Sequence, residues 1–233
     1  MLRFFPTILT LANLVCGFIA IQQGDYYISS LLILVSFVFD GFDGYAARKL
    51  DAVSDMGKQL DSLADMVSFG AAPAYLYYLL APNDNFITLA APCLIVMAGA
   101  LRLAKFNVSP SKGYFMGLPI PANALFYLGL ILSIETGNEF IMNLYDNQWV
   151  YILTPIVMSS LMVSFKIRMF STKTLSDKFF ENKFQIAIFI IFLIMAYIYR
   201  FAALSYIVLI YVVLSLVYSL TFKDHAETSA QHS

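Results

Sequence analysis

Residues 40–65 have the sequence DGFDGYAARKLDAVSDMGKQLDSLAD and join two apolar stretches, near 27–48 and 58–81. Each apolar stretch is long enough to cross the hydrocarbon core of a bilayer as a helix. The quoted segment is therefore predicted to be the turn of a helical hairpin, together with the polar ends of both helices.

The composition of the whole chain agrees with a membrane location. Of its 233 residues, 60% are hydrophobic and 12% are charged, whereas soluble domains have about 45–50% apolar and about 25% charged residues. The 21 Phe and 15 Tyr residues would leave large apolar patches facing water in a soluble globule. A soluble fold is thereby excluded, and the net charge of −1 argues against a nucleic-acid partner.

Further apolar stretches continue on both sides of the hairpin. We expect an all-α, polytopic membrane helical bundle in which residues 1–170 form a six-helix membrane domain. Residues 171–222 are expected to hold the end of a cytoplasmic loop and two additional transmembrane helices, and residues 223–233 a polar tail. The eight predicted spans lie near 5–23, 27–48, 58–81, 85–105, 119–135, 148–165, 184–200 and 203–222.

The basic residues predict an orientation, because Lys and Arg accumulate in cytoplasmic loops. If the amino terminus lies inside, thirteen of the fourteen basic residues fall in inner segments, and only Arg200 falls in an outer one. This split predicts a multi-pass protein of the cell membrane with both termini in the cytoplasm. It also places the quoted segment at the cytoplasmic face.

Four aspartates of the quoted segment, Asp40, Asp43, Asp61 and Asp65, lie within or at the ends of apolar helices. An ionised carboxylate is costly there unless it faces a polar cavity or a cation. At about 100° per residue, each pair occupies one face of its helix, so all four can point into one space. Oxygen ligands without His or Cys suit Mg²⁺ or Mn²⁺, and we expect two ions, which commonly clamp a phosphoryl group.

Small residues accompany the aspartates on the same helical faces. Gly44 and Ala47 follow Asp43, and Gly57 lies one turn before Asp61. Small residues leave room for a bulky polar substrate beside the backbone, but they also line close helix interfaces in membranes. The sequence leaves both interpretations open.

The spacing of these residues resembles the signature of the CDP-alcohol phosphotransferases at every fixed position. The pattern runs Asp40-x-x-Asp43-Gly44-x-x-Ala47-Arg48, then eight residues, then Gly57-x-x-x-Asp61-x-x-x-Asp65. The resemblance implies a six-helix membrane core, usually homodimeric. It also implies transfer of a phosphatidyl or similar group from a CDP-linked donor to an alcohol, with release of CMP.

The resemblance further implies a role for each signature residue. The expected metal ligands are Asp40, Asp43, Asp61 and Asp65, of which Asp65 would also act as general base on the acceptor hydroxyl. Gly44 and Ala47 would lie against the cytidine, and Arg48 would order the site or the pyrophosphate.

Stretches outside the signature resemble the phosphatidylserine synthase branch of this family. They are TLANLVCGF (10–18), LDSLADMVSFGAAPA (60–74), ALRLAKFN (100–107) and FMGLPIPANA (115–124). The branch implies CDP-diacylglycerol as donor and L-serine as acceptor. An acceptor such as inositol phosphate or glycerol phosphate is the alternative, although its dianionic phosphate calls for a richer basic cluster. An aspartate-based ion or proton transporter is a remote alternative, because it predicts repeated halves that the chain lacks.

Three polar residues outside the signature are candidates for substrate binding. Arg102 and Lys105, at the predicted cytoplasmic end of the fourth helix, can bind the carboxylate of serine or a substrate phosphate, or can anchor the helix as positive-inside residues. Asn13, inside the first helix, can reach the nucleotide or make an interhelical hydrogen bond. In the stretch 115–124, Pro119 and Pro121 predict a helix start, and Gly117 a close approach.

Overall fold

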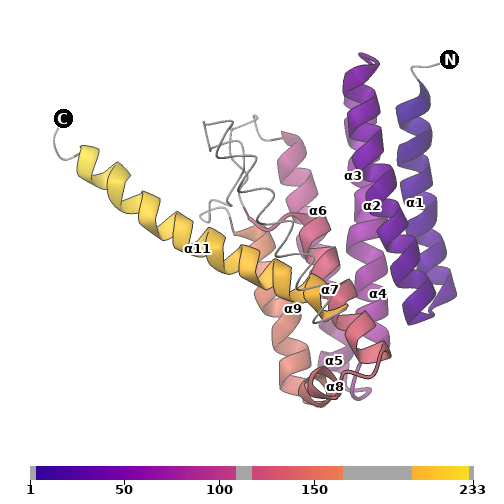
Figure 1. Ribbon diagram of the computed structural model, residues 1–233, viewed down its shortest axis with the longest axis vertical. Helices are drawn as coiled ribbons and strands as arrows, with labels where there is room; N and C mark the ends of the chain where they lie inside the picture. The colour runs from indigo at the N-terminus through magenta and orange to yellow at the C-terminus, as the bar shows by residue number, and fades with distance from the viewer. Residues whose placement is uncertain (1–3, 109–116, 165–200, 231–233) are drawn as a thin grey trace.

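The computed structural model describes residues 4–108, 117–164 and 201–230, the last with side chains up to residue 216. Helices and short turns make up these residues, and no strand occurs among them. In Figure 1, α1, α2 and the α3–α4 helix stand close together, and α11 runs obliquely away from the bundle. The helices are α1 (Phe5–Gln23), α2 (Tyr26–Lys49), α3 (Asp55–Asp65), η2 (Met66–Ala71), α4 (Ala72–Leu79), α5 (Phe86–Ala90), α6 (Cys93–Val108), α7 (Ile120–Glu135), α8 (Glu139–Tyr145), α9 (Gln148–Val163) and α11 (Ala202–Ala230).

The helical hairpin of the sequence analysis is present, with local signals at its ends. The Asp25 carboxylate caps α2 by accepting a hydrogen bond of 2.7 Å from the backbone N–H of Ile28. The Ser54 hydroxyl caps α3 by accepting one of 3.0 Å from the N–H of Gly57. A short connection between Lys49 and Asp55 therefore sets the two aspartate-bearing helices side by side.

The predicted helix 58–81 is observed as a continuous helix from Asp55 to Leu79, but its middle is a π-helix. In η2 the N–H of Ala72 bonds to the carbonyl of Val67, five residues earlier. Pro73 follows directly, and its missing N–H removes one hydrogen bond from a regular ladder. The wide turn absorbs this defect inside a continuous helix.

The apolar helices confirm a membrane protein of the all-α class. By length and composition, α1, α2 and the pair α5–α6 are each long and apolar enough to cross a bilayer. The pair α7–α8 qualifies as well, bent by 111°, while α9 and residues 202–216 of α11 are apolar but shorter. The predicted helix 184–200 lies outside the described residues.

Two features of the structure were absent from the sequence prediction. The connection after α7, predicted to be an outer one, contains the short helix α8, which is capped by Asn138 and holds Ile141 in the core. The predicted span 85–105 is divided at Ala91 and Pro92 into α5 and α6. The short helices α5 and α8 have 5 and 7 residues, too few for hydrophobic periodicity to identify them.

Close contacts at small residues join the later helices. Gly117 has φ +74° and lies against α9, where an added Cβ would come within 2.6 Å of the Met162 carbonyl oxygen. The predicted close approach at Gly117 and the helix start at Pro119 are confirmed. Similarly, α11 packs on α7 where a Cβ at Gly129 would meet the backbone nitrogen of Ser205 at 2.5 Å.

Candidate metal and substrate site

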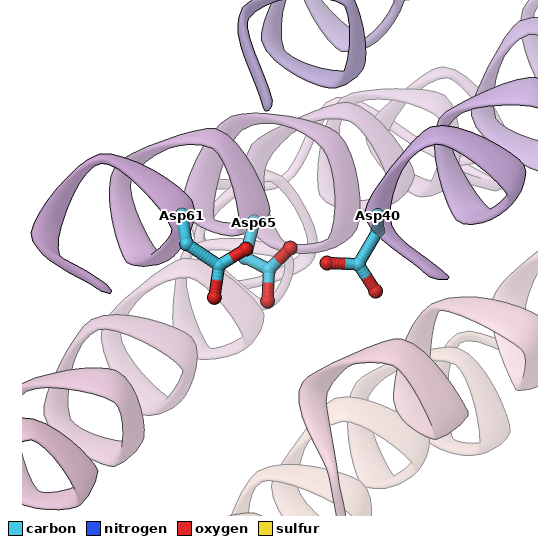
Figure 2. A group of neighbouring side chains, drawn as sticks. All are labelled: Asp40, Asp61 and Asp65. Atoms are coloured by element: carbon cyan, nitrogen blue, oxygen red, sulfur yellow. The ribbon is translucent and has the colours of Figure 1, made fainter. Parts of the chain in front are cut away.

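Three aspartates from two helices meet at the hairpin. Asp40 projects from α2 toward Asp61 and Asp65 of α3, as Figure 2 shows. One carboxylate oxygen from each lies within 4.8 Å of the others. Asp65 is 9% exposed, and the other two are half-buried. The turn-by-turn spacing in α3 thus brings both of its aspartates to the same side as Asp40, as predicted.

Asp43 lies one turn further along α2 and outside this three-carboxylate group. Its side chain is 5% exposed and accepts a hydrogen bond of 2.6 Å from the Thr10 hydroxyl of α1. It still interacts electrostatically with both Asp40 and Asp61. Asp43 is therefore a neighbour of the group, with its carboxylate held on the α1 side.

Helix α1 contributes a second polar contact through Asn13. Its fully buried amide donates to Oδ1 of Asp65 at 3.4 Å, which realises the interhelical hydrogen bond considered for this residue. Its backbone carbonyl accepts hydrogen bonds from Ser36 of α2 at 3.2 Å and from Ser68 of η2 at 2.8 Å. These bonds fix the position of α1 along its own axis relative to α2 and η2, next to the aspartates.

The small signature residues line open space. A Cβ added to Gly44 would lie 3.4 Å from Nη1 of Arg48 on the same helix, and one added to Gly57 would lie 3.1 Å from the Ser54 hydroxyl. No atom of another described helix lies within 4 Å of either position. Close helix packing therefore does not account for these two glycines within the described residues, whereas room for a substrate does. Ala47, between them in sequence, is half-buried.

Arg102 of α6 is buried on the same side of the molecule. It is 9% exposed, and its Nε has no hydrogen-bond partner among the described residues. Its guanidinium interacts electrostatically with Asp65 and with Tyr211 of α11. A buried cation with an unused donor is suited to an anionic ligand. Lys105, one turn later, is exposed.

Two asparagines near the predicted acceptor region differ in their surroundings. Asn107 joins α6 to α3, since its amide donates to Gln59 at 3.1 Å and to Ser62 at 3.0 Å. Asn123 of α7 is 1% exposed, and neither of its amide atoms has a partner in the described part of the chain. Asn107 is thus engaged in joining helices.

The hydroxyl residues around the aspartates were not found from the sequence. Thr10, Ser36 and Ser68 occur singly in apolar helices, where hydroxyl groups ordinarily bond to a carbonyl of the preceding turn. Thr10 and Ser36 do approach such carbonyls, at Pro6 and Leu32. Only the arrangement of the helices shows that they also bond across to neighbouring elements.

The donor set fits a divalent metal. Three acceptor-only carboxylates lie together, with a fourth beside them, and the buried Oδ1 of Asn13 has no partner among the described residues. When these carboxylates are ionised together in an apolar helical bundle, they require a compensating cation. Hard oxygen ligands favour Mg²⁺ or Mn²⁺.

Comparison with known proteins gives consistent matches. A family model described as CDP-alcohol phosphatidyltransferase matches residues 3–152. A protein of Methanocaldococcus jannaschii named CDP-diacylglycerol--serine O-phosphatidyltransferase is 43% identical over 137 residues, 58% of this chain and 62% of that protein. One of the same name from Bacillus subtilis is 43% identical over 125 residues, 52% of this chain and 71% of that protein.

A third relative has a different lipid in its name. The archaetidylserine synthase of Methanothermobacter thermautotrophicus is 39% identical over 147 residues, covering 59% of this chain and 63% of that protein. The aligned parts thus span less than two thirds of the length of the two archaeal relatives. The region matched by the family model contains α1 to α8 and the complete aspartate arrangement.

Proposed function

The chain belongs to the CDP-alcohol phosphatidyltransferase family, and from this membership we propose that it transfers the phosphatidyl group of CDP-diacylglycerol to L-serine. The observation that carries the proposal is the convergence of Asp40, Asp61 and Asp65 in the hairpin. The names of the relatives support serine as the acceptor, since two name serine beside CDP-diacylglycerol and the third names archaetidylserine.

The aspartates supply the metal site of this proposal. Asp40, Asp43, Asp61 and Asp65 would hold two Mg²⁺ or Mn²⁺ ions, as the oxygen donor set favours. When bound, the ions supply positive charge that neutralises the pyrophosphate of the donor. The open space beside Gly44 and Gly57 leaves room for the cytidine end of the donor, with the Arg48 guanidinium next to Gly44. We assign Ala47, which is half-buried on the same helix as Gly44, to the same substrate surface.

The reaction is a single displacement in which Asp65 is the general base. Asn13 engages Oδ1 of Asp65, so Oδ2 accepts the proton of the serine hydroxyl. The serine oxygen then forms a bond to the phosphatidyl phosphorus, and the bond from that phosphorus to the CMP oxygen breaks. The electron pair of this bond leaves with CMP.

Arg102 is assigned to the acceptor in this proposal. Its buried guanidinium has a free donor and lies within electrostatic range of Asp65. A fixed cation at that position binds the serine carboxylate and keeps it away from the aspartates. Lys105 is assigned to the same anionic group or to substrate phosphate from its exposed position one turn later.

The experiment is an acceptor panel with purified protein. CDP-diacylglycerol and Mn²⁺ or Mg²⁺ are supplied with L-serine, glycerol 3-phosphate or inositol 1-phosphate, and release of CMP is followed. We expect CMP release with serine, abolished by EDTA and by Asp65→Asn. Exclusive use of a phosphorylated acceptor would assign the chain to another branch of the family.

A matched variant tests whether loss of activity comes from the site itself or from loss of any negative charge in residues 40–65. Asp51→Asn makes the same chemical change in the hairpin connection, where Asp51 is exposed and has φ 49°, a conformation that Asn tolerates well. Its activity is expected to remain near that of the unchanged protein. Equal losses in Asp51→Asn and Asp65→Asn would remove Asp65 from its catalytic role.

Two properties of the assembly complete the proposal. The active site faces the cytoplasm and both termini lie there, as the distribution of basic residues supports. The protein is a homodimer, which the resemblance to the family supports. Light scattering of the detergent-solubilised protein measures the oligomeric state, and a monomeric mass at working concentration would contradict the dimer.

A further inference from the structure

Thr10 of α1 contacts an aspartate of the site through a short hydrogen bond. Its Oγ1 lies 2.6 Å from Oδ2 of Asp43 and 3.1 Å from the carbonyl oxygen of Pro6. A hydroxyl has one hydrogen to donate, and a carboxylate is the stronger acceptor. The hydrogen therefore points to Asp43, and both side chains are 5% exposed, so water does not compete for it.

Asp43 needs such a contact to have a defined orientation. It lies within electrostatic range of Asp40 and Asp61, and like charges repel its carboxylate from the place where a shared cation would lie. A hydrogen bond to one oxygen limits rotation of the carboxylate about its Cβ–Cγ bond. Thr10 thereby determines which oxygen of Asp43 is held on the α1 side.

The position of Thr10 is itself fixed by the packing of α1. The Asn13 carbonyl, one turn along α1, accepts hydrogen bonds from Ser36 of α2 and Ser68 of η2. These bonds connect α1 to α2, which carries Asp40 and Asp43, and to the helix that carries Asp61 and Asp65. The Thr10 hydroxyl is consequently held at the level of the aspartates by contacts that do not involve them.

We propose that Thr10 is a positioning residue for metal binding: its hydroxyl holds Oδ2 of Asp43 so that Oδ1 is presented to a cation shared with Asp40, Asp61 and Asp65. The inference rests on the metal site of the proposed function, but it does not depend on the identity of the acceptor alcohol. Thr10 touches neither substrate nor metal in this arrangement, and it acts through Asp43.

The test compares Thr10→Val, which keeps the shape and loses the hydroxyl, with Thr10→Ser, which keeps the hydroxyl. Mn²⁺ binding to the purified full chain is measured by electron paramagnetic resonance without any substrate. We expect Thr10→Val to weaken Mn²⁺ binding by about 10- to 100-fold, the usual effect of removing a partner of a metal ligand. Thr10→Ser should restore affinity to within about threefold, since it preserves that partner.

Thr7→Val is the matched control, because Thr7 lies one turn earlier on α1, is half-buried and makes no described hydrogen bond. Its Mn²⁺ affinity should be unchanged. Thr10→Val with unchanged Mn²⁺ affinity, or Thr10→Ser as weak as Thr10→Val, would overturn the proposal. If Thr10→Val fails to give a monodisperse protein, Thr10→Ala replaces it, since a smaller side chain adds no clash.

A double mutant and the acceptor panel make the outcome specific. In the Asp43→Ala background, Thr10→Val should cause little further loss of Mn²⁺ affinity, because the carboxylate through which Thr10 acts is already absent. Independent losses would contradict a role through Asp43. Weakened Mn²⁺ binding in Thr10→Val together with no serine-dependent CMP release by the unchanged protein would uphold this inference and reject serine as acceptor.

Discussion

Under the proposed function, replacement of the single side chain Arg102 should affect recognition of the acceptor more than recognition of the donor. Its guanidinium is buried, and its Nε has no partner in the described part of the chain. Arg102→Gln should raise the KM for serine by about 10- to 100-fold, which corresponds to loss of one charged hydrogen bond. Steady-state kinetics with each substrate varied in turn measures this, and the KM for CDP-diacylglycerol should change much less.

The lysine replacement provides the comparison for Arg102. Arg102→Lys keeps the charge but loses the planar pair of donors that fits a carboxylate. Its KM for serine should therefore lie between the KM of the unchanged protein and that of Arg102→Gln. A larger rise in the KM for CDP-diacylglycerol than for serine, in both variants, would assign Arg102 to the pyrophosphate.

At the scale of single residues, the sequence predicts which charged side chains belong to the site better than it predicts the neutral side chains that contact them. Asp61 and Asp65 were predicted to face Asp40 because a carboxylate in an apolar helix is costly and helical spacing fixes its direction. Thr10 has no such signal, since a threonine satisfies its hydroxyl within its own helix. The hydrogen bond from this hydroxyl to Asp43 therefore could not be predicted.

At the scale of helices, the approach of α1 to η2 depends on Gly17. A Cβ at this position would lie 2.6 Å from Cα of Ser68, so Gly17→Ala must push the two helices apart. We expect a loss of stability of about 1–3 kcal/mol, as for other overpacked sites. Because Asn13 of the same helix contacts Asp65, CMP release should fall as well.

A second glycine serves as control for this prediction. Gly41 of α2 has nothing within 4 Å of an added Cβ, so Gly41→Ala should be neutral or stabilise its helix by up to about 1 kcal/mol. Thermal unfolding of both variants in the same detergent compares them. A melting temperature of Gly17→Ala at or above that of Gly41→Ala would show that the α1–η2 contact adjusts freely.

The contact between α4 and α9 depends on two tyrosines. Tyr77 and Tyr151 stack with ring centroids 4.4 Å apart, and each hydroxyl donates to the backbone carbonyl of the other, at 2.7 and 3.0 Å. Tyr77→Phe keeps the stacked rings and loses one of these bonds, so it should destabilise the fold by about 1 kcal/mol.

Tyr127 is the natural control for this change. It is fully buried in the same cluster, and its hydroxyl has no partner among the described residues. Removing an unpaired buried hydroxyl relieves its desolvation cost, so Tyr127→Phe should leave stability unchanged or raise it. Equal destabilisation by both replacements, measured by thermal unfolding, would show that the carbonyl contacts of Tyr77 contribute nothing.

Helix boundaries were predictable where local signals are strong. Asp25, Ser54 and Pro119 mark the starts of α2, α3 and α7 as capping or initiating residues. The π-helical course of η2 has no comparable signal, because a window of apolar residues fits both kinds of helix. Tertiary packing therefore decides the hydrogen-bond pattern there.

At the scale of the whole molecule, the charge distribution predicts which loops face the cytoplasm. In a background with Cys16→Ser and Cys93→Ser, Val53→Cys places a thiol in the hairpin connection and Glu139→Cys places one at the start of α8, both at exposed positions. A membrane-impermeant maleimide applied to intact cells should label Glu139→Cys only. Labelling of Val53→Cys alone would reverse the orientation.

The connections between successive helices lie at opposite ends of the bundle, as the predicted topology requires. Figure 1 places α5 and α8 together at one end of the bundle and the amino terminus at the other. A hydrogen bond of 3.0 Å from Asn83 to Gln148 joins a predicted outer connection to the start of α9, whereas Lys58 and Asn107 meet at the opposite end. Composition alone could predict the class of fold, but the mutual placement of the helices follows from contacts between side chains far apart in sequence.

The wide turn of η2 has a consequence for the length of the chain. A turn closed by a bond to the fifth preceding residue contains one residue more than an α-helical turn. Deleting one residue from η2 leaves a turn of α-helical length, so Asp61 and Asp65 can keep their direction relative to Tyr77, whereas the same deletion in a regular α-helix would rotate them by about 100°. The extra residue of η2 therefore makes the distance in sequence between the aspartates and Tyr77 adjustable: loss of one residue from η2 is expected to convert the π-turn to an α-helical turn and to leave the aspartates facing Asp40.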